Sequence, residues 1–271
     1  MRRLCRCVLL QEQYIVGVKD KMKYEIKYSP AYSLLDVSLD SNEIIVAEAG
    51  AMVYMTPQIN VKTRKREEKG LWKTIKTTLL GGESFFVNEY IAEKSSGKVG
   101  FVPAPVGDIK PFEVKAGKGL ILQKSSYVAS TKDIHLDTEW QGFKKGLFGQ
   151  SLFMLKVSGE GQLFVNAFGA MDHHSIKNGE SLVVDNYHLV AFDDTCKYDV
   201  KKFGGLKSTI LGGEGLVTEI YGPGEVWIQT KNLREFTDWL WELLHQRVEN
   251  TARTIADQKS GQSGFQFGKK F

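Results

Sequence analysis

The residue types of this chain could in principle support a nucleophile or a phosphate site around residues 81–86. The stretch Gly82-Glu83-Ser84-Phe85-Phe86 resembles the tight turn that exposes a nucleophilic serine, but that motif requires a glycine where Phe86 stands. The simpler interpretation is that Ser84 begins a strand. Gly81-Gly82 also lacks the spacing and the lysine of a phosphate-binding loop, and Glu83 would repel an anion.

Metal chemistry has one candidate cluster, Asp172-His173-His174. Neighbouring residues of a strand point to opposite faces, so His173 and His174 could share a metal ion only in a loop. Cys5 and Cys7 have no second pair to complete a tetrahedral zinc site, and with Cys196 they form no disulfide framework. We therefore predict no catalytic residues, no metal and no cofactor, and a reducing, cytoplasmic setting.

Three stretches that mix lysine with aromatic residues form the candidate contact surface. Each precedes a turn that contains glycine, so equivalent stretches would lie on one face of the protein. A basic and apolar rim suits an anionic membrane or a protein partner, whereas the alternative is a set of ordinary loops with solvated lysines. The candidate residues are Trp72, Lys73, Lys76, Phe143, Lys144, Lys145, Phe148, Lys202, Phe203 and Lys207.

The charge of the chain is concentrated at its ends. Residues 1–21 have a net charge of +3, and so do residues 259–271. Because the whole chain has a net charge of +4, residues 22–258 carry −2. Nucleic-acid binding requires a basic surface, so we consider a nucleic-acid partner unlikely. No apolar run approaches the length of a membrane-spanning helix. The apolar run near the start, Val8-Leu9-Leu10, is too short for a secretory signal.

The elements that would position these residues are strands. From Met22 onward, apolar and polar residues alternate with a period of two, which is typical of half-buried strands. Gly97, Gly161 and Gly224 each open a strand of matching polarity and lie 64 and 63 residues apart. This spacing predicts one structural unit used three times, and chance similarity among hairpins is the alternative.

One segment has helical periodicity. Asn232 followed by Glu235 three residues later is a capping-box arrangement that predicts a helix start. We expect the helix to dock on the sheets, and contact with a partner or a membrane is the alternative. Its predicted apolar arc comprises Leu233, Phe236, Trp239, Leu240, Trp241, Leu243, Leu244 and Val248.

The residues from Met22 to about Leu233 resemble a widespread prokaryotic family of unknown function whose eukaryotic relatives are called altered inheritance of mitochondria proteins. The resemblance implies a fold like the tryptophan RNA-binding attenuation protein (TRAP), a short double-stranded β-helix, with three such domains per chain and trimeric rings of nine domains. It also implies a scaffolding role at membranes and no enzymatic activity. The stretches that carry it are Ala47-Glu48-Ala49-Gly50-Ala51-Met52, Leu80-Gly81-Gly82-Glu83-Ser84-Phe85-Phe86, Gly161-Gln162-Leu163-Phe164 and Gly224-Glu225-Val226-Trp227-Ile228-Gln229-Thr230.

Taken together, these observations predict an all-β protein of three tandem TRAP-like repeats with a C-terminal amphipathic helix. We expect a non-enzymatic, ring-forming scaffold that is a homotrimer, cytoplasmic or peripheral to a membrane. An RNA- or small-ligand-binding ring is the alternative. The predicted segments are a disordered extension at 1–21, repeats at 22–107, 108–173 and 174–231, the helix at 232–258 and a disordered tail at 259–271.

Overall fold

The computed structural model of the protein describes residues 22–65, 86–104, 106–139, 154–202 and 216–262. These residues form antiparallel strands in four sheets and one C-terminal helix, so the predicted β body followed by a helix is confirmed. The chain divides into two compact units, residues 1–231 and 232–271, and each is described by itself.

The strands of the first unit fall into three successive sets of six, preceded by β1 (Lys23–Lys27). The first set is β2 (Leu34–Leu39), β3 (Ile44–Glu48), β4 (Met52–Met55), β5 (Ile59–Lys65), β6 (Phe86–Ala92) and β7 (Gly97–Phe101). The second is β8 (Gly107–Val114), β9 (Leu120–Gln123), β10 (Tyr127–Thr131), β11 (Ile134–Glu139), β12 (Met154–Gly159) and β13 (Gly161–Phe168), with a short 3-10 helix at Lys124–Ser126. The third is β14 (Met171–Ile176), β15 (Ser181–Asp185), β16 (Leu189–Asp193), β17 (Lys197–Lys202), β18 (Leu216–Tyr221) and β19 (Gly224–Gln229).

The pairing order is the same in all three sets. The first and third strands of each set pair with the sixth, and the second and fourth pair with the fifth. Each third-to-sixth pairing also contains a register shift, at 52/54, 127/129 and 189/191. Identical pairing with an identically placed irregularity shows that the three sets are built on one plan.

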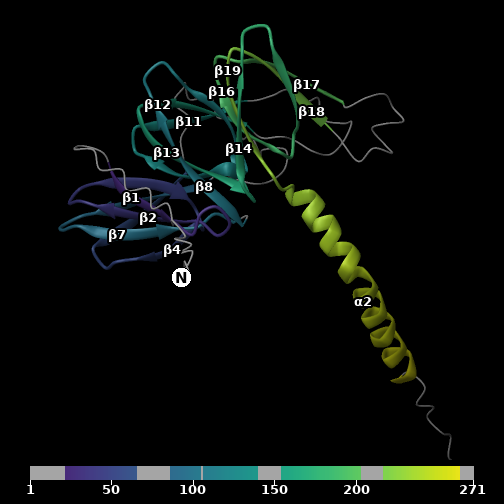
Figure 1. The fold of residues 1–271 in the computed structure, drawn as a ribbon. Helices are drawn as coiled ribbons and strands as arrows, with labels where there is room; N and C mark the ends of the chain where they lie inside the picture. Colours follow the sequence, from purple (N-terminus) through teal and green to yellow (C-terminus); the bar gives the residue numbers. More distant parts are fainter. Residues whose placement is uncertain (1–21, 66–85, 105, 140–153, 203–215, 263–271) are drawn as a thin grey trace, which may run out of the picture. The chain divides into compact units, whose positions relative to one another are not determined.

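The sheets join neighbouring sets to one another. Their strand orders are β1-β2-β7-β4, β5-β6-β3-β10-β13-β8, β11-β12-β9-β16-β19-β14 and β15-β18-β17. The strands of the first sheet are seen side by side in Figure 1. Each six-stranded sheet therefore combines half of one set with half of the next.

Alternating side chains fill the space between the sheets. In β2, Leu35, Val37 and Leu39 are fully buried, as the period-two pattern predicts. Phe164 of β13 packs edge-on against Tyr24 of β1, with ring centroids 4.8 Å apart. Three apolar clusters result, and each draws residues from neighbouring sets, so the sets share their cores.

One glycine is required by close packing where the second set begins. A Cβ atom on Gly107 would lie 1.8 Å from the carbonyl oxygen of Ala167 in the neighbouring strand. Because that neighbour is backbone and cannot swing aside, only glycine fits there.

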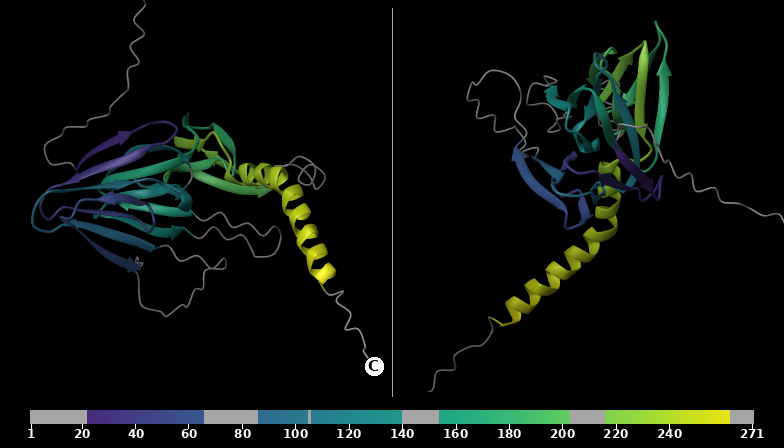
Figure 2. Two further views of the ribbon diagram at one scale, coloured as in Figure 1. Left: turned by 90° about the horizontal axis from the view of Figure 1, so that it is seen from below. Right: turned by 90° about the vertical axis from the view of Figure 1, so that its left-hand side faces the viewer.

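The second unit is built around α2 (Leu233–Gln262), an uninterrupted helix of 30 residues (Figure 2). Asn232 caps it, because its Oδ1 accepts hydrogen bonds from the N–H groups of Arg234 (2.9 Å) and Glu235 (3.3 Å). The helix extends four residues past the predicted end at 258. All eight side chains of its predicted apolar arc are exposed, by 39–63%.

We predict that Phe164→Ala lowers the free energy of unfolding by about 3–5 kcal/mol, because it removes a fully buried ring and leaves a cavity. The measurement is urea unfolding followed by tryptophan fluorescence. Phe236→Ala is the matched control, since this ring in α2 is exposed and its loss should change stability by less than about 0.5 kcal/mol. Equal effects of the two substitutions would contradict the described core.

Candidate functional site

The predicted lysine–aromatic surface lies almost entirely outside the described residues. Among its members only Lys202 is described, as the last residue of β17, paired in register with Leu216. The other nine fall in 66–85, 140–153 and 203–215, and Ser84 with its neighbouring glycines lies in the first of these segments. Each segment connects the fourth and fifth strands of its set, so all three occupy the same place in the strand order.

The histidine cluster is placed in strand β14, where its members have separate acidic partners. His173 Nε2 lies 2.5 Å from Glu225 Oε2, and its ring stacks on Trp227 with centroids 5.3 Å apart. His174 Nε2 lies 3.2 Å from Asp172 Oδ2. In the described part of the chain, no group of three or more histidine, cysteine or acidic side chains is arranged to hold a metal ion.

The most informative feature is the way in which one set joins the next. The second strand of the first set pairs with the third strand of the second, placing Ala47 opposite Ala129. The second strand of the second set pairs with the third strand of the third in the same way, placing Leu122 opposite Ala191. Both junctions are antiparallel ladders of three residue pairs.

The junction between the first two sets is also held by a buried side chain. The Tyr127 hydroxyl donates a hydrogen bond to the carbonyl oxygen of Val46 across the junction, at 3.1 Å, and lies 3.1 Å from Ser130 Oγ. A buried tyrosine needs such partners, because burying a hydroxyl without a hydrogen bond is unfavourable.

Two strands that the pattern would place in further junctions lie at sheet edges instead. The third strand of the first set, β4, ends the first sheet, and the second strand of the third set, β15, ends the fourth. Met52–Met55 of β4 are 37–53% exposed, whereas the corresponding four residues of β10 and of β16 are 0–1% exposed. On β15, Val183 is 49% exposed.

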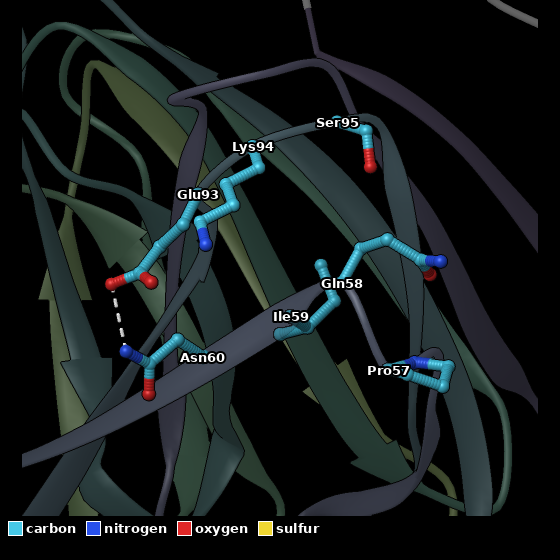
Figure 3. Close-up of a pocket in the computed structure, with 7 residues that line it drawn as sticks. All are labelled: Pro57, Gln58, Ile59, Asn60, Glu93, Lys94 and Ser95. Carbon is cyan, nitrogen blue, oxygen red and sulfur yellow. Dashed lines mark hydrogen bonds between the residues drawn. The ribbon is translucent and has the colours of Figure 1, made fainter.

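An open hollow lies beside β4. It has a volume of about 490 Å³ and is formed by the turn after β4, the start of β5 and the turn between β6 and β7 (Figure 3). Its lining is mainly polar, and Asn60 Nδ2 donates a hydrogen bond to Glu93 Oε1 at 2.7 Å within it. The lining residues are Pro57, Gln58, Ile59, Asn60, Glu93, Lys94 and Ser95.

One carboxyl group near the first junction has a strongly altered pKa. Burial at the end of β3 raises the pKa of Glu48 from its ordinary 4.5 to about 7, and Lys124 only partly opposes this shift.

Sequence reasoning did not recognise the open edge at 52–55, the hollow or the raised pKa of Glu48. A signal for the edge is present in the sequence. Met52-Val53-Tyr54-Met55 is apolar at every position, like Leu189-Val190-Ala191-Phe192, and such a run indicates a strand that is covered on both faces.

Comparisons with known proteins agree on one family. The family model described as mitochondrial biogenesis AIM24 matches residues 24–231. An uncharacterized protein of Streptococcus pyogenes serotype M6 is 28% identical over 229 residues, which are 82% of this chain and 91% of that protein. A crystal structure of a Streptococcus pyogenes protein is similar with a TM-score of 0.69 and 27% identity, covering 83% of this chain and all of that one.

We predict that the contribution of Glu48 to the stability of the protein decreases as the pH rises from about 4.5 to about 7. In this range the folded protein retains the Glu48 proton that the unfolded chain releases, so raising the pH favours unfolding. Glu48→Gln should remove this contribution and stabilise the protein more at about pH 8 than at about pH 5 in urea unfolding. Glu160→Gln, at an exposed turn, is the control, and an equal pH response of both variants would refute the assignment.

Proposed function

This chain belongs to the mitochondrial biogenesis AIM24 family, and we propose that it is a non-enzymatic scaffold that assembles with copies of itself into a ring. The observation that carries the proposal is the exposure of β4. The same strand position is buried in two internal junctions and exposed only where the chain supplies no further set.

The three sets support the interpretation as three copies of one TRAP-like unit. They share their pairing order and the position of their register shift. A unit of this kind presents one edge through its second strand and another through its third, so units can add in a line or close into a ring. A chain of three units uses two of these contacts internally and leaves one edge open at each end.

The open edges are complementary to each other. In each set, the third-strand residue of the junction lies seven residues after its second-strand counterpart: Tyr54 after Ala47, Ala129 after Leu122, and Ala191 after Val184. The two open edges, Val184 of one copy and Tyr54 of another, would therefore pair as the internal junctions do. Extending the internal register places Val184 of one copy opposite Tyr54 of the next, with Val183 opposite Met55. Such a ladder would satisfy unpaired backbone groups and cover the flexible methionine side chains.

Three copies is the number that the family resemblance implies, since rings of nine units need three chains of three. The contact is head-to-tail, so every chain in a closed ring makes two identical interfaces. A closed ring leaves none of these edges exposed, and this protects the strands from uncontrolled pairing.

Peripheral contact with membranes is the second part of the proposal. The three lysine–aromatic segments all connect the fourth and fifth strands of a set, and this shared position favours one common face in an assembly. Weak attraction of about 1 kcal/mol per lysine near an anionic surface would be multiplied by several loops on one ring. None of the helices in the described residues combines the length and apolar character needed to cross a membrane.

We predict that the protein sediments as a trimer and that Val183→Lys shifts it to the monomer, because a lysine on the open edge opposes strand pairing. Val106→Lys is the matched control, since Val106 is 52% exposed, close to the 49% of Val183, but lies outside both edges. Analytical ultracentrifugation of the full chain is the measurement. A monomeric wild-type protein, or equal behaviour of both variants, would disprove assembly through these edges.

We also predict that replacing Lys73, Lys76, Lys144 and Lys145 by glutamine greatly weakens flotation with vesicles that contain anionic lipid at low salt. Both proteins keep their basic tails, so the difference between them isolates the loops. If the variant floats as well as the wild type, the loops are ordinary solvated segments. Salt-sensitive binding of RNA in place of vesicles would favour the alternative RNA-binding ring.

A further inference from the structure

The hollow beside β4 occupies the place in the first set at which, in the third set, a turn of the preceding set makes contact. At the junction of the second and third sets, the turn that leads into β9 contacts the turn that follows β16. Asp194 N–H donates to the carbonyl oxygen of Gly119, and Gly119 N–H donates to Asp194 Oδ1, both at 3.1 Å. In this way the turn between the first two strands of one set meets the turn after the third strand of the next.

We propose that the hollow receives the turn Lys177–Glu180 of a neighbouring copy of this chain. This inference rests on the proposed ring. The register that joins Leu122 to Ala191 inside the chain joins Val184 to Tyr54 between copies. The same register places Ser181, and the turn before it, next to Pro57 at the rim of the hollow.

The incoming turn is a preformed projection. Glu180 N–H donates to the carbonyl oxygen of Lys177 at 3.0 Å, and Lys177 N–H donates to Glu180 Oε2 at 3.0 Å, so the turn is closed from both sides. At its tip, Gly179 has a φ of +83° and nothing within 4 Å of the position that a Cβ would take. All four residues of the turn are exposed, so they are available to a neighbour.

The chemistry of the hollow fits such an occupant better than an apolar ligand. Small-molecule pockets are lined mainly by apolar and aromatic side chains, whereas this hollow is lined mainly by polar ones. It offers one carboxylate, Glu93, and one ammonium group, Lys94, to a turn that carries one lysine and one glutamate. Opposite charges on the two surfaces would set the register of docking more than its strength.

Because of Pro57, the contact between the turn and the hollow would be made by side chains and not by the backbone. Pro57 corresponds to Asp194 and has no N–H, so the hydrogen bond that Asp194 donates to Gly119 has no counterpart between copies. The ladder between copies would end at Thr56, and the turn beyond it is held by the lining of the hollow.

The test is disulfide cross-linking in the full chain carrying Cys5→Ser and Cys7→Ser, with Gln58→Cys and Asn178→Cys added together. Mild oxidation should convert the single-chain band on a denaturing gel into covalent multimers, because the two thiols come from adjacent copies. Lys94→Cys with Asn178→Cys provides a second pair across the hollow. Each single variant, and the control pair Gln58→Cys with Glu160→Cys, should remain at the mass of one chain.

Sedimentation before oxidation distinguishes a failure of the proposed ring from a failure of the turn to dock in the hollow. If the variants are trimeric and neither pair across the hollow cross-links, the turn does not enter the hollow, and this inference is wrong while the ring stands. If the wild-type protein is monomeric at all concentrations, the ring and this inference fail together.

Discussion

The arrangement of this protein depends on the pairing of backbone groups between the second strand of one set and the third strand of the next. An unpaired row of N–H and C=O groups at a sheet edge invites another strand. Inside the chain this need is met twice, by β3 with β10 and by β9 with β16. Because the same pairing plan recurs in each set, one strand of each kind, β4 and β15, lies at a sheet edge among the described strands.

The composition of the third strands follows from this constraint. A strand that has sheet partners on both sides and is covered on both faces needs apolar or small residues at every position. Tyr127-Val128-Ala129-Ser130 and Leu189-Val190-Ala191-Phe192 meet this requirement and are buried. Met52-Val53-Tyr54-Met55 has the same character without the burial. Its two methionines have flexible and polarizable side chains, a property that would suit the strand contact proposed above.

The junctions also explain the unusual electrostatics of Glu48. It is the last residue of β3, and its counterparts at the ends of β9 and β15 are Gln123 and Asp185. Partial burial of this position removes water from the carboxylate and favours its neutral form. At the second junction the chain carries a neutral amide at this position. Asp185, at the open end, accepts a hydrogen bond from Tyr187 N–H at 2.8 Å.

What the sequence by itself determined was local. Alternation in β2 and the cap at Asn232 depend on residues close together in the chain, and they predicted the β body and the start of the helix. The recurrence of Gly97, Gly161 and Gly224 repeats one such local pattern, and it predicted the period. The sequence did not identify which edges are paired, that the pKa of Glu48 is raised, or where the hollow lies. Only the tertiary structure decided these features, because each depends on residues distant in the chain: Tyr127 and Val46, which bond across a junction, are separated by 81 positions. A period-two pattern states which residues of a strand face inward, but the neighbouring strand is chosen by packing and backbone hydrogen bonding across the whole fold.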